Sequence, residues 1–320
     1  MDGPRLTRAR FLRLAAAGAA AWLAGPVACA DPVPPPAPHT TARRMQTRPI
    51  PATGEALPVI GVGTWQGFDV AGDAEESQRL GAVLAALFAA GGTVIDSSPM
   101  YGRAEAMVGR LLADPGARES AFLATKVWTR GREAGIAQMR ESLRRLGVGR
   151  LDLMQVHNLL DVATHWPVLR EWQAQGRVRY LGLTHYTLTA YAELEAAMRQ
   201  YRPDFVQVDY SVDARVSGER ILPLAADLGI AVIINRPFGG GGLLGALRDR
   251  ALPDVAAELG CDTWAQLLLN FVLGHPAVTC AIPGTSKPAH MVDNARAGAG
   301  AIADAGQRAR IVAAYAAAVR

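Results

Sequence analysis

Residues 121–157 read AFLATKVWTRGREAGIAQMRESLRRLGVGRLDLMQVH, and they show the pattern on which the fold prediction rests. The stretch begins and ends with short, continuously apolar runs, AFLATKV (121–127) and LDLMQVH (151–157), and the segment between them has the periodicity of an amphipathic helix. Strands that are apolar on both faces are typical of a parallel sheet covered by helices. The stretch therefore predicts one strand, helix and strand unit of an α/β fold.

The same alternation continues along the chain on both sides of this unit. Further helical patterns lie at 77–91 and 190–201, and each is followed by Gly or Pro, as is usual at helix ends. Eight strands, each with a crossover helix, match a closed (β/α)8 TIM barrel in a single domain. The other six predicted strands are PVIGVG (58–63), TVIDSS (93–98), VRYLGLT (178–184), DFVQVDY (204–210), IAVIIN (230–235) and VTCAIPG (278–284).

Residues 47–61, TRPIPATGEALPVIG, have the turn chemistry of a small hairpin, and we expect it to cover the bottom of the barrel. A doubly wound open sheet is the structural alternative, because GVGTWQG (61–67) follows the first strand. Its spacing is G-x-G-x-x-x-G and no helix opens on it, so the nucleotide-binding fingerprint of that fold is weak here. The sequence shows no P-loop and no zinc-type Cys/His spacing, and no metal is expected.

The composition is that of a globular protein, because 50% of the 320 residues are apolar and 19% are charged. The net charge is +4, but Arg5, Arg8, Arg10 and Arg13 outnumber Asp2 in the first thirty residues. The remainder is close to neutral. A nucleic-acid partner is therefore not expected.

The N-terminal sequence predicts an export signal. Basic residues precede the apolar run LAAAGAAAWLAG (14–25) and a small-x-small site, which is the order of a cleaved export signal. TRARFLRL (7–14) resembles the twin-arginine type, with Ala9 in the place of the second arginine. We therefore expect an exported protein of the bacterial periplasm, or a cytoplasmic one if the signal is not used. The predicted segments are the signal at 1–30, a proline-rich spacer at 31–44 and the barrel at 45–320.

Three cysteines occur in the chain. Cys29 lies in the signal, where lipid attachment is an alternative to cleavage. Cys261 and Cys280 remain in the body, and Cys280 lies in an apolar strand. Because free buried cysteine is common, no disulfide is expected.

Four polar residues follow three consecutive predicted strands. Lys occurs only at 126 and 287 among 33 basic residues, which singles out both positions. The carboxyl ends of barrel strands open onto one face, and they deliver Asp96, Lys126 and His157 there, with Tyr101 five residues after Asp96. An ammonium beside a phenol lowers the phenol pKa, so Lys126 would make Tyr101 a usable acid. Asp96 would keep the lysine charged, and His157 would hydrogen-bond a substrate oxygen.

These residues carry a family resemblance. Residues 96–105 have the pattern D-x-x-x-x-Y-G-x-x-E, and LATKVW (123–128) and LMQVHN (153–158) follow it. The three segments resemble, in order and spacing, the motifs of the aldo-keto reductase family. The resemblance extends over roughly residues 45–300. It implies a (β/α)8 barrel, a bound nicotinamide dinucleotide, and hydride transfer to an aldehyde or ketone whose oxygen Tyr101 protonates.

Two glycine- and proline-containing segments follow the last two predicted strands, NRPFGGGGLLG (235–245) and IPGTSKPAHMVDN (282–294). Barrels of this kind bind phosphate there, because glycines let backbone N–H groups approach an anion. The resemblance implies that Lys287 and His290 favour NADP, with NAD possible. His185 replaces an asparagine of the family pattern, and Asn235 replaces an aromatic residue. The cofactor-binding residues implied are Gly63, Thr64, Thr184, His185, Gln207, Arg236, Gly239, Gly241, Leu243, Thr285, Ser286, Lys287, His290, Asp293 and Asn294.

Trp65, Met100, Trp128 and Asn158 are expected to line the substrate side, and an aromatic pocket suits a small apolar carbonyl compound. Two other functions remain open at this point. Lys126 could form a Schiff base, as in a barrel aldolase, or the chain could be a nucleotide-sensing partner subunit with negligible turnover. Neither the physiological substrate nor the oligomeric state follows from the sequence.

Overall fold

The eight strands predicted from the sequence all form, and neighbouring strands pair in parallel in chain order. The computed structural model describes residues 44–320. In it the first and last strands meet through bridges from Ile60 to Ala281 and from Gly63 to Gly284, which close the barrel. The barrel strands are β3 (Val62–Gly63), β4 (Val94–Asp96), β5 (Phe122–Val127), β6 (Leu151–Val156), β7 (Val178–Thr184), β8 (Phe205–Asp209), β9 (Ala231–Asn235) and β10 (Cys280–Ala281).

β3 and β10 are shorter than predicted. The sequence suggested 58–63 and 278–284, but each regular strand covers two residues. Pro283 has no backbone N–H to donate, so the ladder is interrupted before the Gly284 bridge. Glycine is also required at position 61, because a Cβ there would lie 2.7 Å from the Cβ atom of Val94 on the neighbouring strand β4.

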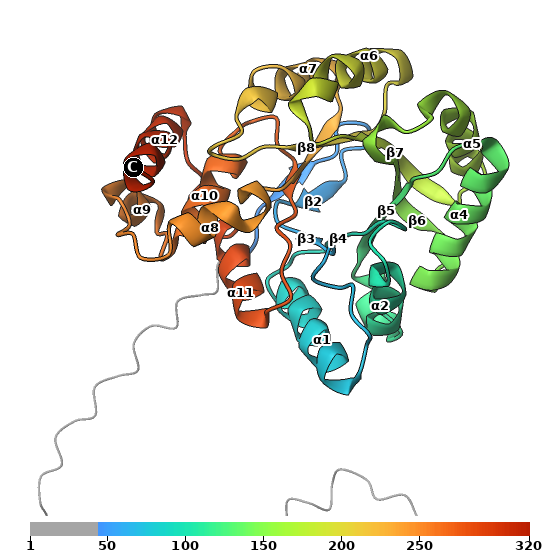
Figure 1. Ribbon diagram of the computed structural model, residues 1–320, viewed down its shortest axis with the longest axis horizontal. Helices are drawn as coiled ribbons and strands as arrows, with labels where there is room; N and C mark the ends of the chain where they lie inside the picture. Colours follow the sequence, from blue (N-terminus) through green and yellow to red (C-terminus); the bar gives the residue numbers. More distant parts are fainter. Residues whose placement is uncertain (1–43) are drawn as a thin grey trace, which may run out of the picture. The chain divides into compact units, whose positions relative to one another are not determined.

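Helices surround the barrel (Figure 1). The predicted helix at 77–91 begins at Ala74, because Asp73 and Glu76 form a capping box. The helix predicted at 135–149 ends at Leu146, where Gly147 adopts a φ of +66°. The helices are α1 (Ala74–Ala89), α2 (Ala104–Leu111), α3 (Pro115–Glu119), α4 (Arg132–Leu146), α5 (Val162–Ala174), α6 (Tyr191–Tyr201), α7 (Ile221–Leu228), α8 (Gly242–Ala246), α9 (Asp254–Leu259), α10 (Trp264–Leu273), α11 (Pro288–Ala297) and α12 (Ala305–Ala318).

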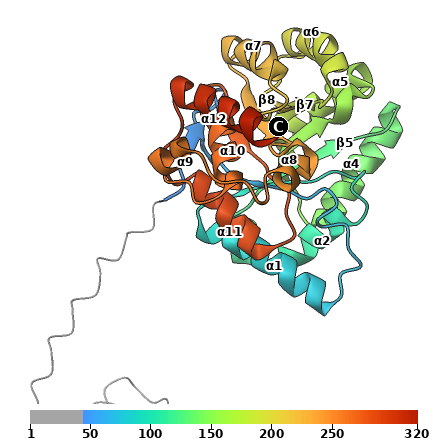
Figure 2. The ribbon, with the colours of Figure 1, turned by 60° about the vertical axis from the view of Figure 1, so that its left-hand side comes forward.

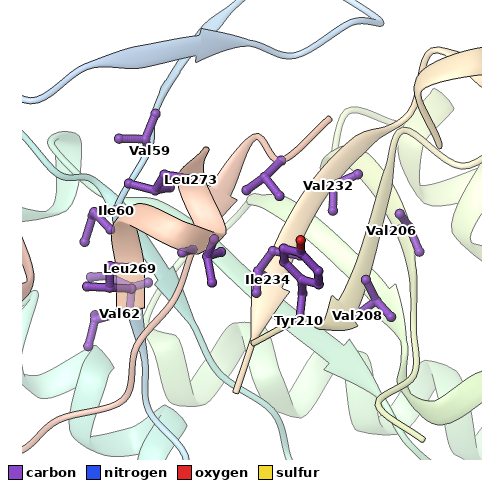
Figure 3. Packing of buried hydrophobic residues seen from close by; sticks show 14 of the residues in the cluster. Val59, Ile60, Val62, Val206, Val208, Tyr210, Val232, Ile234, Leu269 and Leu273 are labelled. Carbon is purple, nitrogen blue, oxygen red and sulfur yellow. The ribbon is translucent and has the colours of Figure 1, made fainter. Parts of the chain in front are cut away.

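Alternate residues of each strand face the barrel interior and the helices. On the outer side, Val206 and Val208 of β8 and the equivalent residues of β9 are buried in one core (Figure 3). Leu269 and Leu273 of α10 belong to the same core. α12 and α9 lie against each other, and α12 also packs on α10 (Figure 2). A separate interior cluster contains residues such as Phe122 at the strand starts.

The predicted hairpin closes the bottom of the barrel. β1 (Thr47–Pro49) and β2 (Ala56–Pro58) pair antiparallel. Ile50 and Leu57 are buried in the interior cluster with Val94 and Phe122, which begin β4 and β5. Arg48 donates to the carbonyl oxygens of residues 273 and 275 at 2.5 and 3.1 Å, and this fixes the hairpin to the end of α10.

The predicted signal at 1–30 and nearly all of the spacer lie outside the described residues. Cys261 and Cys280 are both free and buried. No helix within residues 44–320 is long and apolar enough to cross a membrane.

Ile50→Ala tests the hairpin as a plug. The side chain is fully buried, so its truncation should lower the free energy of unfolding by about 2–4 kcal/mol. Leu188→Ala removes a side chain that is 55% exposed and should change stability by less than about 0.5 kcal/mol. Urea unfolding measures both, and equal small changes would show that the hairpin does not close the core.

Candidate active site

A buried ion pair lies at the carboxyl ends of β4 and β5. Lys126 Nζ lies 2.5 Å from Asp96 Oδ2 and donates to the Ser97 carbonyl oxygen at 2.8 Å. The Lys126 and Asp96 side chains are 0% and 2% exposed. The other Asp96 oxygen accepts from Gln155 of β6 at 3.0 Å and from Gln207 of β8 at 2.9 Å. One carboxylate therefore joins side chains from three further strands.

Tyr101 and His157 lie beside this pair. Tyr101 is in the turn after β4, and Lys126 Nζ is 5.0 Å from the centre of its ring. His157 follows β6 directly, and its ring stands edge-on to that of Tyr101 with the centroids 5.8 Å apart. The fold thus brings together the four polar residues that the sequence placed at the strand ends.

The proton affinity of Tyr101 differs from the expectation. Burial raises the pKa of Tyr101, and the Lys126 ammonium offsets only part of this effect. The sequence predicted that Lys126 brings the phenol pKa below its ordinary value. This is wrong for the protein without bound cofactor, because desolvation of the phenolate outweighs the effect of the nearby charge. Burial also opposes the charge of Lys126, but Asp96 and Tyr101 together raise the Lys126 pKa above its ordinary value. The site therefore holds a protonated phenol next to an ammonium.

His157 is neutral. Burial lowers its pKa to about 2, and the Lys126 ammonium and the nearby His185 ring act in the same direction. Its Nδ1 atom lies 3.0 Å from the Oγ atom of Ser98, a fully buried residue. A neutral imidazole keeps one N–H, which it can offer to an oxygen atom without a change of charge.

Three residues were expected at the nicotinamide amide. Thr184 ends β7 and His185 follows it directly, whereas Gln207 lies in the middle of β8, where it pairs with Thr184. His185 Nδ1 accepts from the next two backbone N–H groups at 3.0 and 3.2 Å, so the proton of the neutral ring is on Nε2. The Gln207 amide is hydrogen-bonded into the barrel, and Asn235 Nδ2 lies 3.4 Å from its oxygen. The Asn235 Oδ1 atom is buried and has no partner within residues 44–320.

The glycine-rich loop follows β9. Gly239, Gly240 and Gly241 have φ angles of +59°, +73° and +100°, a region that favours glycine. A Cβ on Gly241 would meet nothing within 4 Å, so this side of the loop is open. The Arg236 guanidinium lies over the loop, 3.1 Å from where a Gly240 Cβ would be. Leu243 faces inward and is 5% exposed in the outer core.

Residues 285–287 lead into α11. Thr285 Oγ1 accepts from the Lys287 N–H at 3.1 Å, and Lys287 is the N-cap residue. Ser286 is half-buried, Lys287 and His290 are exposed, and Asn294 is buried. The exposed side chains of Lys287 and His290 therefore lie on the surface at the N-terminal end of α11.

Asp293 lies on α11 and is hydrogen-bonded to the start of α10. Its carboxylate accepts from Thr263 Oγ1 at 2.8 Å and from Gln266 Nε2 at 2.6 Å. Both donors lie at the start of α10. The side chain therefore fastens α11 to α10, and the cofactor contact that motif position implies for Asp293 stays a prediction.

Gly63 and Thr64 lie at the end of β3. A Cβ on Gly63 would lie 3.0 Å from the Ile282 carbonyl oxygen, so glycine allows close packing of β3 against the last strand. Thr64 is fully buried, and its hydroxyl donates to Ser97 Oγ at 2.9 Å. The Thr64 hydroxyl is therefore used within the barrel.

The expected substrate side is an apolar rim. Trp65, Met100 and Trp128 are 49%, 37% and 40% exposed in the loops after β3, β4 and β5. Gln138 of α4 holds Trp128 in place, because it accepts from the Trp128 N–H at 2.6 Å and donates to its carbonyl at 3.1 Å. Asn158 adopts a φ of +51° directly after the site histidine, and its Oδ1 atom is buried without a partner among the described residues.

Sequence reasoning missed three residues that support the site: Ser98, Gln138 and Gln155. Ser98 lies between Asp96 and Tyr101 in the motif at 96–105, and Gln155 is the single amide in the apolar run LMQVH, so both positions were visible in the sequence. Gln138 gives no local signal, because its partner is ten residues earlier on another element.

A hollow lies at the opposite end of the barrel from these residues. It has a volume of about 1000 Å³ and is lined by hairpin residues together with Phe122, Asp152 and Arg179. None of the predicted site residues lines it. Arg179 is paired there with Glu55 and Asp152, which leaves the carboxyl-terminal face as the location of the reactive groups. Within residues 44–320 no cluster of His, Cys, Asp or Glu could hold a metal ion.

A parallel eight-stranded barrel with its reactive side chains gathered at the strand ends defines the class of barrel enzymes. The Aldo/keto reductase family matches residues 59–315, and the chain belongs to this family. The chain is 32% identical over 260 residues to the methylglyoxal reductase YeaE of Escherichia coli (strain K12). The aligned region covers 78% of this chain and 89% of that relative. An aldo/keto reductase from Klebsiella pneumoniae in complex with NADP and acetate superposes with a TM-score of 0.69 at 28% identity, over 82% of this chain and 93% of that one.

The low pKa of His157 predicts acid sensitivity. Below pH 6.5 the unfolded chain binds a proton at this residue, and the folded protein does not until about pH 2, so stability falls as the pH falls. Between pH 7 and pH 5.5 the wild type should lose about 1 kcal/mol more than His157→Gln. Urea unfolding of both proteins at the two pH values measures this difference, and equal losses would contradict a neutral His157.

Proposed function

We propose that the protein reduces aldehyde or ketone carbonyls to alcohols with NADPH. The observation that carries this proposal is the Tyr101 phenol held next to the buried Lys126–Asp96 pair and the neutral His157. Membership of the Aldo/keto reductase family supports it, as do relatives that are themselves reductases. The nicotinamide dinucleotide supplies the hydride when it is bound.

Each of the four residues has a role that follows from its chemistry. Tyr101 gives its proton to the carbonyl oxygen as the carbonyl carbon is reduced. The Lys126 ammonium stabilises the phenolate that remains, which offsets the desolvation that raises the Tyr101 pKa. Asp96 keeps Lys126 charged and directs it, and His157 orients the carbonyl oxygen through its remaining N–H.

The chain offers groups that fit a dinucleotide. The buried Asn235 Oδ1 lacks a hydrogen-bond partner among the described residues and can accept from a carboxamide N–H, whereas His185 can donate from Nε2. The open side of the loop at 239–241 and the Arg236 guanidinium suit a diphosphate. Lys287 at the start of α11 suits a 2′-phosphate, which favours NADP over NAD. Solved relatives from Klebsiella pneumoniae were crystallised with NADP and NADPH.

The substrate that the rim favours is apolar. Trp65, Met100 and Trp128 offer aromatic and thioether surface around the site, and the fixed backbone of Trp128 makes that wall rigid. Such a surface accepts an aromatic or aliphatic aldehyde and orients it through few polar groups.

The two alternatives are less well supported. A Schiff base needs a neutral lysine, but Lys126 is fully buried, bonded to Asp96 and Ser97, and has a raised pKa. A nucleotide-sensing subunit would have no use for a phenol held beside an ammonium, and the relative from Escherichia coli is a reductase.

Tyr101→Phe tests the proton donor. With an aromatic aldehyde as substrate, kcat should fall about 10²- to 10⁴-fold, because Phe has no hydroxyl proton to donate to the carbonyl oxygen. NADPH binding, followed by fluorescence, should be nearly unchanged. Tyr315→Phe on α12 is the control for loss of a distant phenol. Unchanged turnover would remove Tyr101 from this role, and failure to bind either NADPH or NADH would reject the proposed function.

Lys287→Ala tests the cofactor preference. The exposed ammonium should contribute to binding of the 2′-phosphate alone, so the Kd for NADPH should rise about 10-fold and that for NADH little. Arg296→Ala removes a cation from the same helix at a position that is 63% exposed and serves as the control. Equal losses for both cofactors would deny Lys287 a contact with the 2′-phosphate.

We also propose that the protein is exported in the folded state with some cofactor bound. The proposal rests on TRARFLRL (7–14) and the apolar run after it, because a dinucleotide made in the cytoplasm can cross the inner membrane only with a folded protein. Residues 1–40 fused to a reporter that fluoresces outside the cytoplasm only when exported folded should give a periplasmic signal. A signal confined to the cytoplasm, or one that persists without the folded-protein translocase, would reject this.

A further inference from the structure

We propose that Ser98 is a positioning residue that fixes His157 in one tautomer, with its proton on Nε2. The two side chains meet in the interior, where Ser98 Oγ lies 3.0 Å from His157 Nδ1. Ser98 is 0% exposed and His157 is 5% exposed, so water does not compete for this contact. The inference rests on the proposed function only for its catalytic consequence.

The direction of this hydrogen bond follows from the other partner of the hydroxyl. Within residues 44–320, Ser98 Oγ has one further contact, the backbone N–H of Met100 at 3.4 Å, and that group is a donor. If His157 Nδ1 carried the proton, the Ser98 oxygen would accept twice and its own hydrogen would have no acceptor. A buried donor without a partner is costly. The hydroxyl therefore donates to Nδ1.

This assignment determines what His157 presents to the site. The imidazole is neutral and carries a single proton, so acceptance at Nδ1 leaves Nε2 as the N–H donor. No group of the described residues pairs with Nε2, and Nε2 is not among the buried atoms that lack a partner. It therefore keeps contact with the open side, next to Tyr101. A carbonyl oxygen there would receive the Nε2 proton as a hydrogen bond and the Tyr101 proton in reduction.

The first test is spectroscopic and needs no activity. In ¹⁵N-labelled, cofactor-free protein, two-bond ¹H–¹⁵N correlations should show His157 with a protonated Nε2 and an unprotonated Nδ1. Ser98→Ala should move both nitrogen shifts towards those of a tautomer mixture. Ser142→Ala removes another fully buried hydroxyl, remote on α4, and should leave them unchanged. A wild type with the proton on Nδ1, or no change in Ser98→Ala, would overturn the proposal.

The second test is a double-mutant cycle on turnover. Ser98→Ala alone should lower kcat about 3- to 10-fold, because loss of one hydrogen bond relaxes the tautomer preference without abolishing it. In a His157→Gln background, where no tautomer exists, Ser98→Ala should change kcat by less than about twofold. Equal losses in both backgrounds would show a merely structural role and overturn the proposal. Absence of reductase activity in the wild type would reject the proposed function, and the nitrogen shifts would still decide the tautomer.

Discussion

The Lys126–Asp96 ion pair constrains the rest of the barrel. Both side chains are removed from water, and desolvation of such a pair costs several kcal/mol for each ion unless its remaining donors and acceptors are satisfied. Here the ammonium also reaches the Ser97 carbonyl, and the carboxylate accepts from Gln155 and Gln207. Because each amide lies on a different strand, the pair remains satisfied only while β4, β5, β6 and β8 keep their register.

The interior of the barrel changes character along the strands. In the lower half of the barrel the inward residues are apolar, as at Val94, Leu153 and Phe205, and they form one cluster with the hairpin residues. Two residues further along the same strands the inward positions are Asp96, Gln155 and Gln207. The period-two alternation therefore places a polar layer directly above an apolar floor. One end of the barrel supplies stability, and the other end holds groups in an environment that changes their proton affinities.

The features of the fold and the site that could be predicted were those that a short segment of sequence determines. Continuous apolar runs between helical patterns were sufficient for the eight strands, and chain order then placed Asp96, Lys126 and His157 on one face. The pairing of Lys126 with Asp96 followed from this placement. The partner of His157 did not, because the bond from Ser98 to His157 spans 59 positions and depends on how two strands are aligned. The predicted direction of the Tyr101 pKa shift was wrong, because the depth of burial is a property of the packed barrel and not of the motif.

Lysine occurs at only two positions of this arginine-rich chain, and at one of them there is a physical reason for lysine in place of arginine. The Lys126 ammonium has three N–H groups, and it faces the Asp96 carboxylate, the Ser97 carbonyl and the Tyr101 phenol. An arginine would bring five donors in a rigid plane into a space that is 0% exposed, and the surplus donors would have no acceptors. Lys287 is exposed at the start of a helix, where either cation could be accommodated. The composition therefore carries information at position 126 because that position is buried, and a count of lysines alone cannot make this distinction.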